Sequence, residues 1–413
     1  MTDETSPFLR LKAPRPTGNV IIVFGDIPED EQLRILEKGS RSMGAGAQAL
    51  ALAADDVARI DTLDLPQPIL MRGLGIGTIH VPGHAGIAAV AQTFRAEEGV
   101  NEARPEFFMY AMPPSVLASD DLFRTWGVAR TGAENSPFTG RGIRVAVLDT
   151  GFDLDHPDFQ GRTIVHQSFV PGEDVMDGQG HGTHCIGTAA GPRGGANLPR
   201  YGIATEAEIY VGKVLNNRGV GTETDILAGM EWAIEQGCQV ISMSLGRPTQ
   251  TGEKPSAAYE RLGRMALDRG ALIAAAAGND STREFGFVAP VGAPANSPSI
   301  MAVAAVDASD NVANFSSGGI NTNGGEVNIA APGVSVFSSV PRPRLYDTLN
   351  GTSMACPHVA GIAALWAESD PGLRGQSLWD ALVRSAQPMS HPASDVGAGM
   401  VQAPGGDEAA PIA

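Results

Sequence analysis

Beyond residue 140 the chain contains a series of continuous apolar runs, and these limit the possible folds strongly. Each run is long enough for one strand and lacks polar alternation, which is typical of strands that are covered on both faces. The runs occupy residues 143–149, 207–215, 239–246, 271–279 and 299–307, and helical patterns that end at glycine occupy residues 224–237 and 256–270. This alternation predicts an α/β fold, in which helices flank a mostly parallel sheet. Functional side chains gather at the carboxyl ends of the strands in such sheets.

The N-terminal part of the chain has a different pattern. Strand-like runs at residues 19–25, 74–81 and 105–112 alternate with helical patterns at 28–39 and 84–99, which predicts a small α+β domain. We therefore expect four segments: a flexible arm at residues 1–17, the small domain at 18–117, the α/β domain at 118–403, and a tail at 404–413.

Composition and charge exclude several classes of protein. The net charge of −17 disfavours nucleic acid as a partner, because like charges repel phosphates. No apolar run approaches the roughly 18 residues that a membrane span needs. The N-terminus has no apolar segment of the kind found in secretory signals, so we expect a cytoplasmic protein, although a secreted chain that had lost its signal would have the same pattern. Three scattered cysteines (Cys185, Cys238 and Cys356) are no disulfide framework.

Three polar clusters in the α/β part contain residue types that carry chemistry: residues 147–159, 178–188 and 350–361. Taken singly, each has an ordinary explanation. Asp149 ends a strand, His181 and His184 are either satisfied histidines or a metal pair, and Ser353 caps a helix. A zinc pair is disfavoured, because no HExxH glutamate or third ligand accompanies the histidines.

Taken together, the clusters supply the parts of an acyl-transfer site. The Ser353 hydroxyl needs an imidazole to accept its proton, and His181 needs a carboxylate such as Asp149 to orient it. The oxyanion needs preplaced donors, for which we expect the backbone N–H of Ser353 and the amide of Asn279. A GxSxG turn, which marks many esterases, is absent, and the chain order differs from theirs.

The motifs DTG, HGTH and GTSMA, with AAAAGN and SMSLG between them, resemble those of the subtilisin-like serine proteases, the subtilases. The likeness extends from about Trp126 to Gln402. It implies a serine endopeptidase in which Asp149, His181 and Ser353 are catalytic, Asn279 forms the oxyanion hole, and no cofactor is required for the chemistry. Its partner would be a peptide or protein substrate.

The same resemblance implies a substrate cleft. Its two walls would be Ser244, Leu245 and Gly246 on one side and Ala276, Ala277 and Gly278 on the other, with Gly292 at the floor. Small residues on both walls predict an open pocket for a large apolar or aromatic residue before the scissile bond.

Residues 18–117 resemble the subtilase propeptide, which is an intramolecular chaperone and inhibitor. The resemblance implies that the segment Phe108–Met112 lies in the cleft and that the chain cuts itself within residues 110–118. Two alternatives remain open: an unrelated N-terminal binding domain, and a specialised or autoinhibited homologue that matures a precursor peptide or acts as a regulatory module.

Calcium sites are frequent in subtilases, and Asp158 and Asp307 match two family ligand positions. The loop at residues 190–202, however, has Gly, Pro and Arg where further ligands are expected. Arg247 stands where the family usually has glycine. We expect it either to favour acidic substrate residues or to point into solvent.

Overall fold

The computed structural model describes residues 14–43, 48–63, 65–84, 86–111, 123–194, 198–321 and 323–405. Its centre is a parallel sheet with the strand order β14-β13-β12-β10-β6-β8-β7. These strands are β6 (Arg144–Asp149), β7 (Ile164–Ser168), β8 (Glu208–Lys213), β10 (Val240–Met243), β12 (Leu272–Ala276), β13 (Met301–Val306) and β14 (Ile329–Pro332). Each neighbouring pair runs parallel, which confirms the predicted fold class.

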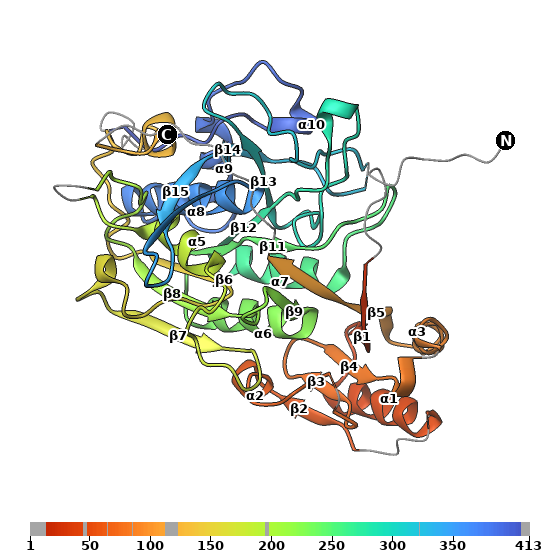
Figure 1. Cartoon of the computed structure of the whole chain (residues 1–413). Coiled ribbons are helices and arrows are strands. Elements are labelled where there is room, and N and C mark those ends of the chain that lie inside the picture. The colour runs from red at the N-terminus through yellow and green to blue at the C-terminus, as the bar shows by residue number, and fades with distance from the viewer. Residues whose placement is uncertain are drawn as a thin grey trace.

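Helices cover both faces of this sheet (Figure 1). They are α4 (Trp126–Arg130), α5 (His181–Ala190), α6 (Glu223–Glu235), α7 (Ala257–Asp268), α8 (Thr352–Ser369), α9 (Gln376–Ser385) and α10 (Ala393–Val396). Successive residues of a strand point to opposite faces. Accordingly, Val145 and Val147 join the core under α5 and α8, whereas Ala146 and Leu148 join the core under α6 and α7.

The N-terminal part forms a second sheet that packs on the outer side of α6 and α7. Its strands are β1 (Pro16–Phe24), β2 (Leu50–Leu52), β3 (Ile69–Met71), β4 (Ile76–His80) and β5 (Val100–Ala111), and its helices are α1 (Glu29–Ser42), α2 (Ala54–Val57) and α3 (Ile87–Arg95). Ile21 and Val23 share one core with residues of α6 and α7, while Val20 and Ile22 face a separate core under α1 and α3.

Several elements differ from the sequence-based expectation. β1 begins at Pro16, inside the expected arm, and β5 begins at Val100 and is longer than the predicted strand. The predicted strand 239–246 is divided into β10 and the short β11 (Leu245–Gly246). The pattern did not reveal β9 (Val220–Thr222) or the hairpin of β15 (Val336–Ser339) and β16 (Tyr346–Leu349). The predicted boundary at residue 117 and most of the predicted tail lie outside the described residues.

Candidate active site

Asp149 and His181 form the first part of the site. Asp149 ends β6, and His181 is the first residue of α5. The His181 Nδ1 atom lies 2.8 Å from Oδ1 and 3.0 Å from Oδ2 of Asp149, and both side chains are buried. Burial disfavours the imidazolium, but the nearby Asp149 carboxylate outweighs this effect and holds the pKa of His181 well above its usual range.

Asp177 organises the start of α5, a role that the sequence did not reveal. Its Oδ2 accepts hydrogen bonds from the Thr183 backbone N–H at 2.9 Å and from the Thr183 hydroxyl at 2.7 Å. Its Oδ1 accepts from the Gly180 N–H at 2.7 Å and from the Thr150 hydroxyl at 2.9 Å. This carboxylate therefore ties the helix that carries His181 to the residue that follows Asp149. A carboxylate close before a helix start is a capping signal that could have identified it.

Ser353 is the second residue of α8 and is fully buried. Its hydroxyl donates to the backbone carbonyl of Ser244 at 3.0 Å, while the Ser244 hydroxyl donates to the Ser353 carbonyl at 2.7 Å. The Nε2 atom of His181 is buried and has no hydrogen-bond partner among the described residues. The imidazole thus keeps a ring nitrogen for a further proton donor, and Ser353 is engaged with the cleft strand.

Asn279 is oriented by its neighbour on α8. Its Oδ1 accepts from the backbone N–H of Thr352 at 2.9 Å and from the Thr352 hydroxyl at 2.8 Å. The amide nitrogen therefore faces away from Thr352. Gly351 has a φ of 153°, and a Cβ there would lie 3.0 Å from that nitrogen. The Ser353 N–H belongs to the first turn of α8, where backbone donors have no intrahelical acceptor.

The three stretches predicted to form a cleft lie together in the structure. β10 pairs in parallel with β12, which brings the strand before Ser244 beside the strand that ends at Ala276. The Gly292 N–H donates to the Ala277 carbonyl at 2.8 Å, and a Cβ on Gly292 would meet the Arg247 carbonyl at 2.6 Å. Glycine is therefore required where the two walls meet.

The end of β5 is the middle strand of an antiparallel group that includes one predicted wall of the cleft. On one side Ala111 and Tyr110 pair with Leu245 and Gly246 of β11. On the other side Phe108, Met109 and Tyr110 pair with β9. The arrow of β5 runs from the N-terminal sheet toward the centre of the larger unit (Figure 1). Met112 and the predicted self-cleavage range beyond Ala111 lie outside the described residues.

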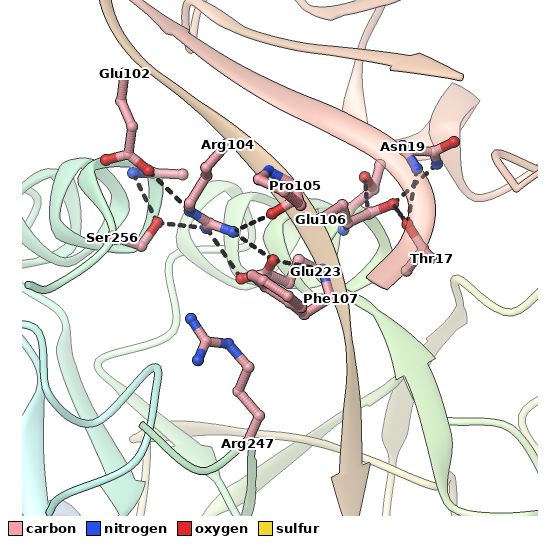
Figure 2. Close-up of polar contacts among 12 residues, drawn as sticks. Thr17, Asn19, Glu102, Arg104, Pro105, Glu106, Phe107, Glu223, Arg247 and Ser256 are labelled. Carbon is pink, nitrogen blue, oxygen red and sulfur yellow. Dashed lines mark hydrogen bonds and ion pairs between the residues drawn. The ribbon is translucent and has the colours of Figure 1, made fainter. Parts of the chain in front are cut away.

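Upstream on β5, two charged residues contact the helix starts of the larger unit (Figure 2). Arg104 forms two bonds to the buried Glu223 carboxylate, at 2.7 and 3.0 Å. Glu106 accepts from Thr17 at 2.6 Å, from Asn19 at 2.9 Å and from the Thr224 N–H at 2.9 Å. Burial raises the pKa of Glu106. Arg104 and Glu106 therefore join the N-terminal unit to the larger unit through largely buried polar contacts.

The structure corrects the prediction that Arg247 points into solvent. The Arg247 side chain is buried, and a carboxylate pairs with its charge. Its side chain is 5% exposed and pairs with Glu253 at 2.7 Å. The guanidinium carbon lies 4.7 Å from the centre of the Phe107 ring.

The expected calcium ligands have other partners. Asp158 accepts hydrogen bonds from the hydroxyl groups of Tyr201 and, at 3.0 Å, Tyr346. At the two ends of the loop that follows α5, Arg162 donates to the carbonyls of Ala190 and Ala207. These contacts do not fit a calcium ion at Asp158.

Asp307 closes a tight turn. Its carboxylate accepts from the Ser309 and Asn311 N–H groups, both at 2.9 Å, and from the Asn311 amide at 3.1 Å. These contacts are those of a turn residue and do not favour a second calcium site.

Among the described residues, one group of three potential metal ligands lies close together, and it coincides with the site itself: Asp149, His181 and Cys185. The Cys185 thiol lies 3.8 Å from the His181 Nδ1. His184 points elsewhere, since its Nε2 lies 3.0 Å from the Val336 carbonyl, and burial lowers its pKa to about 3. The alternative of a His181–His184 metal pair therefore finds no support. In the described part of the chain, no helix has the length and apolar character of a membrane span.

A buried carboxylate–imidazole pair beside a serine at a helix start, carried by a parallel α/β sheet, is the architecture of serine hydrolases with the chain order Asp, His, Ser. Residues 140–400 match the sequence model of the subtilase family. The chain belongs to the subtilase family.

Curated relatives agree with this assignment. M-protease of Shouchella clausii (strain KSM-K16) is 42% identical over 250 residues, which cover 60% of this chain and 60% of that protein. Subtilisin Savinase of Lederbergia lenta is 42% identical over 60% of this chain and 85% of that protein. Subtilisin E of Bacillus subtilis (strain 168) is 41% identical over 60% of this chain and 61% of that protein. The match thus spans about three fifths of the length of two of these relatives.

Proposed function

We propose that the chain is a serine endopeptidase, made as a self-processing zymogen, that hydrolyses peptide bonds through an acyl-enzyme. The observation that carries this proposal is the buried Asp149–His181 pair, which the Cys185 thiol links to the carbonyl of Ser353. The Ser353 hydroxyl donates to Ser244, which directly precedes the strand that pairs with β5. The names of the relatives, among them Alkaline protease and Subtilisin, support it.

Each residue has a distinct task in this proposal. The Ser353 hydroxyl turns from the Ser244 carbonyl toward Nε2 of His181, which accepts its proton while Oγ attacks the substrate carbonyl. Asp149 holds the proton on Nδ1 and stabilises the imidazolium that forms. The Ser353 N–H and the Asn279 amide donate to the oxyanion, and His181 then returns the proton to the leaving amine.

The cleft proposal assigns substrate binding to backbone groups of the two walls. β11 pairs with the peptide as a neighbouring strand, so main-chain hydrogen bonds align it without regard to sequence. Ser244, Ala276, Ala277, Gly278 and Gly292 leave room for a large apolar or aromatic side chain before the scissile bond. Aspartate or glutamate at that position is expected to be a poor substrate residue.

We assign the N-terminal unit, residues 18–117, the role of an inhibitor that occupies the cleft before processing. The antiparallel pairing of β5 with both β9 and β11 supports this role, since a substrate needs the same backbone groups. The buried Arg104–Glu223 pair also favours the second candidate, a homologue that stays latent because its N-terminal unit remains docked.

A fluorophosphonate probe tests the first candidate. Wild-type protein is expected to be labelled at Ser353, and Ser353→Ala is expected not to react. N-terminal sequencing separates the two candidates: a new N-terminus within residues 110–118 indicates self-processing, whereas an intact Met1 in a protein that carries Ser353 indicates latency. Cleavage of a peptide library, read by mass spectrometry, then gives the substrate preference.

Structural calcium at Asp158 and Asp307, which the sequence predicts, is disfavoured by the hydrogen bonds of both carboxylates. It is tested by the melting temperature of the full chain with calcium and with a chelator. The location of the protein in the cell is tested by fractionation with an antibody against the full chain.

A further inference from the structure

We propose that Arg247 forms an additional recognition site at the far end of the cleft, which takes an aromatic side chain four positions before the peptide residue that pairs with Leu245. This site rests on the proposed peptidase function, because its occupant would be a substrate. It is a specificity site separate from the pocket between the two walls.

The chain itself shows the occupant. Ala111 pairs with Leu245, and Phe107 lies four residues before Ala111 on the same strand. The Arg247 guanidinium carbon lies 4.7 Å from the centre of the Phe107 ring. Figure 2 shows the guanidinium of Arg247 directed from the larger unit toward the ring. A guanidinium over an aromatic face is attracted by the ring quadrupole, and the attraction grows when water is excluded.

Arg247 is held in place by its own segment, not by the N-terminal unit. One terminal nitrogen donates to Glu253 at 2.7 Å and the other to the Pro248 carbonyl at 3.0 Å. Glu253 is fixed in turn by the Gln250 N–H at 2.9 Å. The backbone of Arg247 bonds to Ala293 at 3.0 and 3.1 Å. The guanidinium is therefore prearranged and would keep its position when another peptide replaces β5.

The charge arrangement favours an aromatic occupant over an acidic one. Glu253 already neutralises Arg247, so an acidic substrate residue would gain little and would meet a second carboxylate. The Nε of Arg247 is buried and has no hydrogen-bond partner in the described parts of the chain. What Arg247 offers a peptide is thus the flat face of a weakly hydrated cation, which suits an aromatic ring.

The peptide backbone is fixed at the same residue. The Phe107 N–H donates to the Glu223 carboxylate at 2.9 Å, and Glu223 is fully buried at the start of α6. One main-chain bond and one ring–guanidinium contact therefore act on a single peptide residue. The bond sets its position, and the ring contact discriminates between side chains.

The first test uses two fluorogenic peptides: PEFFMYAM, which copies residues 105–112, and a partner with Ala in place of the residue that matches Phe107. The full-length protein is used as produced. We expect kcat/KM to be about tenfold higher for the aromatic peptide, mainly through KM, since the contact is the same in the ground and transition states. In Arg247→Gln the ratio should fall close to one.

Two further variants control for misfolding of Arg247→Gln and for general effects of removing an arginine. Arg247→Lys, which keeps the pair with Glu253 but cannot stack flat, should also lower the ratio and covers the case in which Arg247→Gln does not fold. Arg261→Gln is the matched control: this arginine donates to the carbonyls of Phe24, Leu74 and Gly75 in the N-terminal unit, so the ratio should not change. An unchanged ratio in both Arg247 variants would overturn the proposal.

The second test does not require catalysis. In full-length Ser353→Ala protein, hydrogen exchange of the amides of residues 107–111 is measured for Phe107→Ala, Arg247→Gln and the double variant. We expect each single variant to speed exchange and the double variant to add little. Fully additive effects would contradict a ring–guanidinium contact. If the two variants are coupled but the first test shows no peptide hydrolysis, the peptidase proposal fails while the Arg247 site stands. Failure of the site and failure of the peptidase function are therefore distinguishable.

Discussion

At the scale of single residues, the environment of His181 decides what the site can do. Its Nδ1 faces Asp149, and Nε2 is buried with no partner in the described structure. Two further buried histidines, His184 and His358, do not compete for the role. Burial lowers the pKa of His184 to about 3 and that of His358 to about 4, so both are neutral at physiological pH.

The first prediction concerns pH. An imidazolium cannot accept the Ser353 proton, so kcat/KM should fall as the pH falls through the pKa of His181. Because Asp149 holds this pKa above its ordinary value of 6.5, the midpoint of the acid limb should lie above pH 6.5. Asp149→Asn should move the midpoint to lower pH and reduce kcat about 10⁴-fold. A pH–rate profile of both proteins checks this, and an unmoved midpoint would contradict it.

The second prediction concerns the oxyanion donor. Asn279→Asp keeps an oxygen for Thr352 but replaces the amide donor by a carboxylate that repels the oxyanion. We expect kcat to fall at least about 100–1,000-fold, the loss found when such a donor is removed in subtilisin, while the melting temperature stays close to wild type. Steady-state kinetics and calorimetry measure the two quantities. A loss of stability that matches the loss of rate would indicate a structural role instead.

Among the elements, the short strands β9 and β11 and the loop after α5 position groups that lie outside the central sheet. β11 and β9 are brief, yet together they hold the end of β5. The loop after α5 is held by side chains, since Tyr201 and Tyr346 donate to Asp158. Tyr201 also packs at right angles to Phe337, so an aromatic cluster surrounds the carboxylate.

The third prediction tests this cluster. Tyr201→Phe removes a buried hydrogen bond to Asp158 and should lower the free energy of unfolding by about 1.5–3 kcal/mol. Tyr346→Phe is the matched control and should cost less, because its side chain is only half-buried. Chemical denaturation measures both. With the Asp158 oxygens occupied, a chelator should leave the wild-type melting temperature unchanged, and a marked drop would instead support calcium.

At the scale of the whole molecule, the N-terminal unit is joined to the larger unit by a shared core. Ile21, Val23 and Met109 belong to the same apolar cluster as Ile226 and Met230 of α6. Polar contacts lie beside it: Arg104 with Glu223, and Glu106 with Thr224 (Figure 2). Asp225, next to them, has a pKa that burial raises to about 8. Removal of the unit would expose this apolar surface and these acids.

The fourth prediction tests the polar part of that interface. Arg104→Ala leaves Glu223 buried without its bidentate partner, which should weaken docking by about 3–5 kcal/mol. In Ser353→Ala protein, amides of β1 and β5 should then exchange much faster. Arg34→Ala is the control, because Arg34 is 65% exposed on α1 and its pairs should contribute little. Equal protection in both variants would show that the apolar core alone holds the unit.

Local pattern was sufficient for the main elements. Continuous apolar runs predicted a parallel sheet because strands covered on both faces exclude polar residues, and this fold class is confirmed. The short strands β9 and β11 were not predicted as separate strands, because a few residues carry too little periodicity to be recognised. Asp177 was missed although its position before α5 is a capping signal, and its bond to Thr150 joins two separate elements, which no local pattern shows.

Hydrophobic period and motif are local properties of the chain. The order of amino acids therefore specifies which chemical groups are present, in which order, and on which kind of element each lies. Which of these groups meet is a property of the folded chain: Ser353 contacts Ser244, Arg247 contacts Phe107, and Asp158 contacts two tyrosines. These contacts join residues far apart along the chain. They depend on how sheets and helices pack, so no local pattern can specify them.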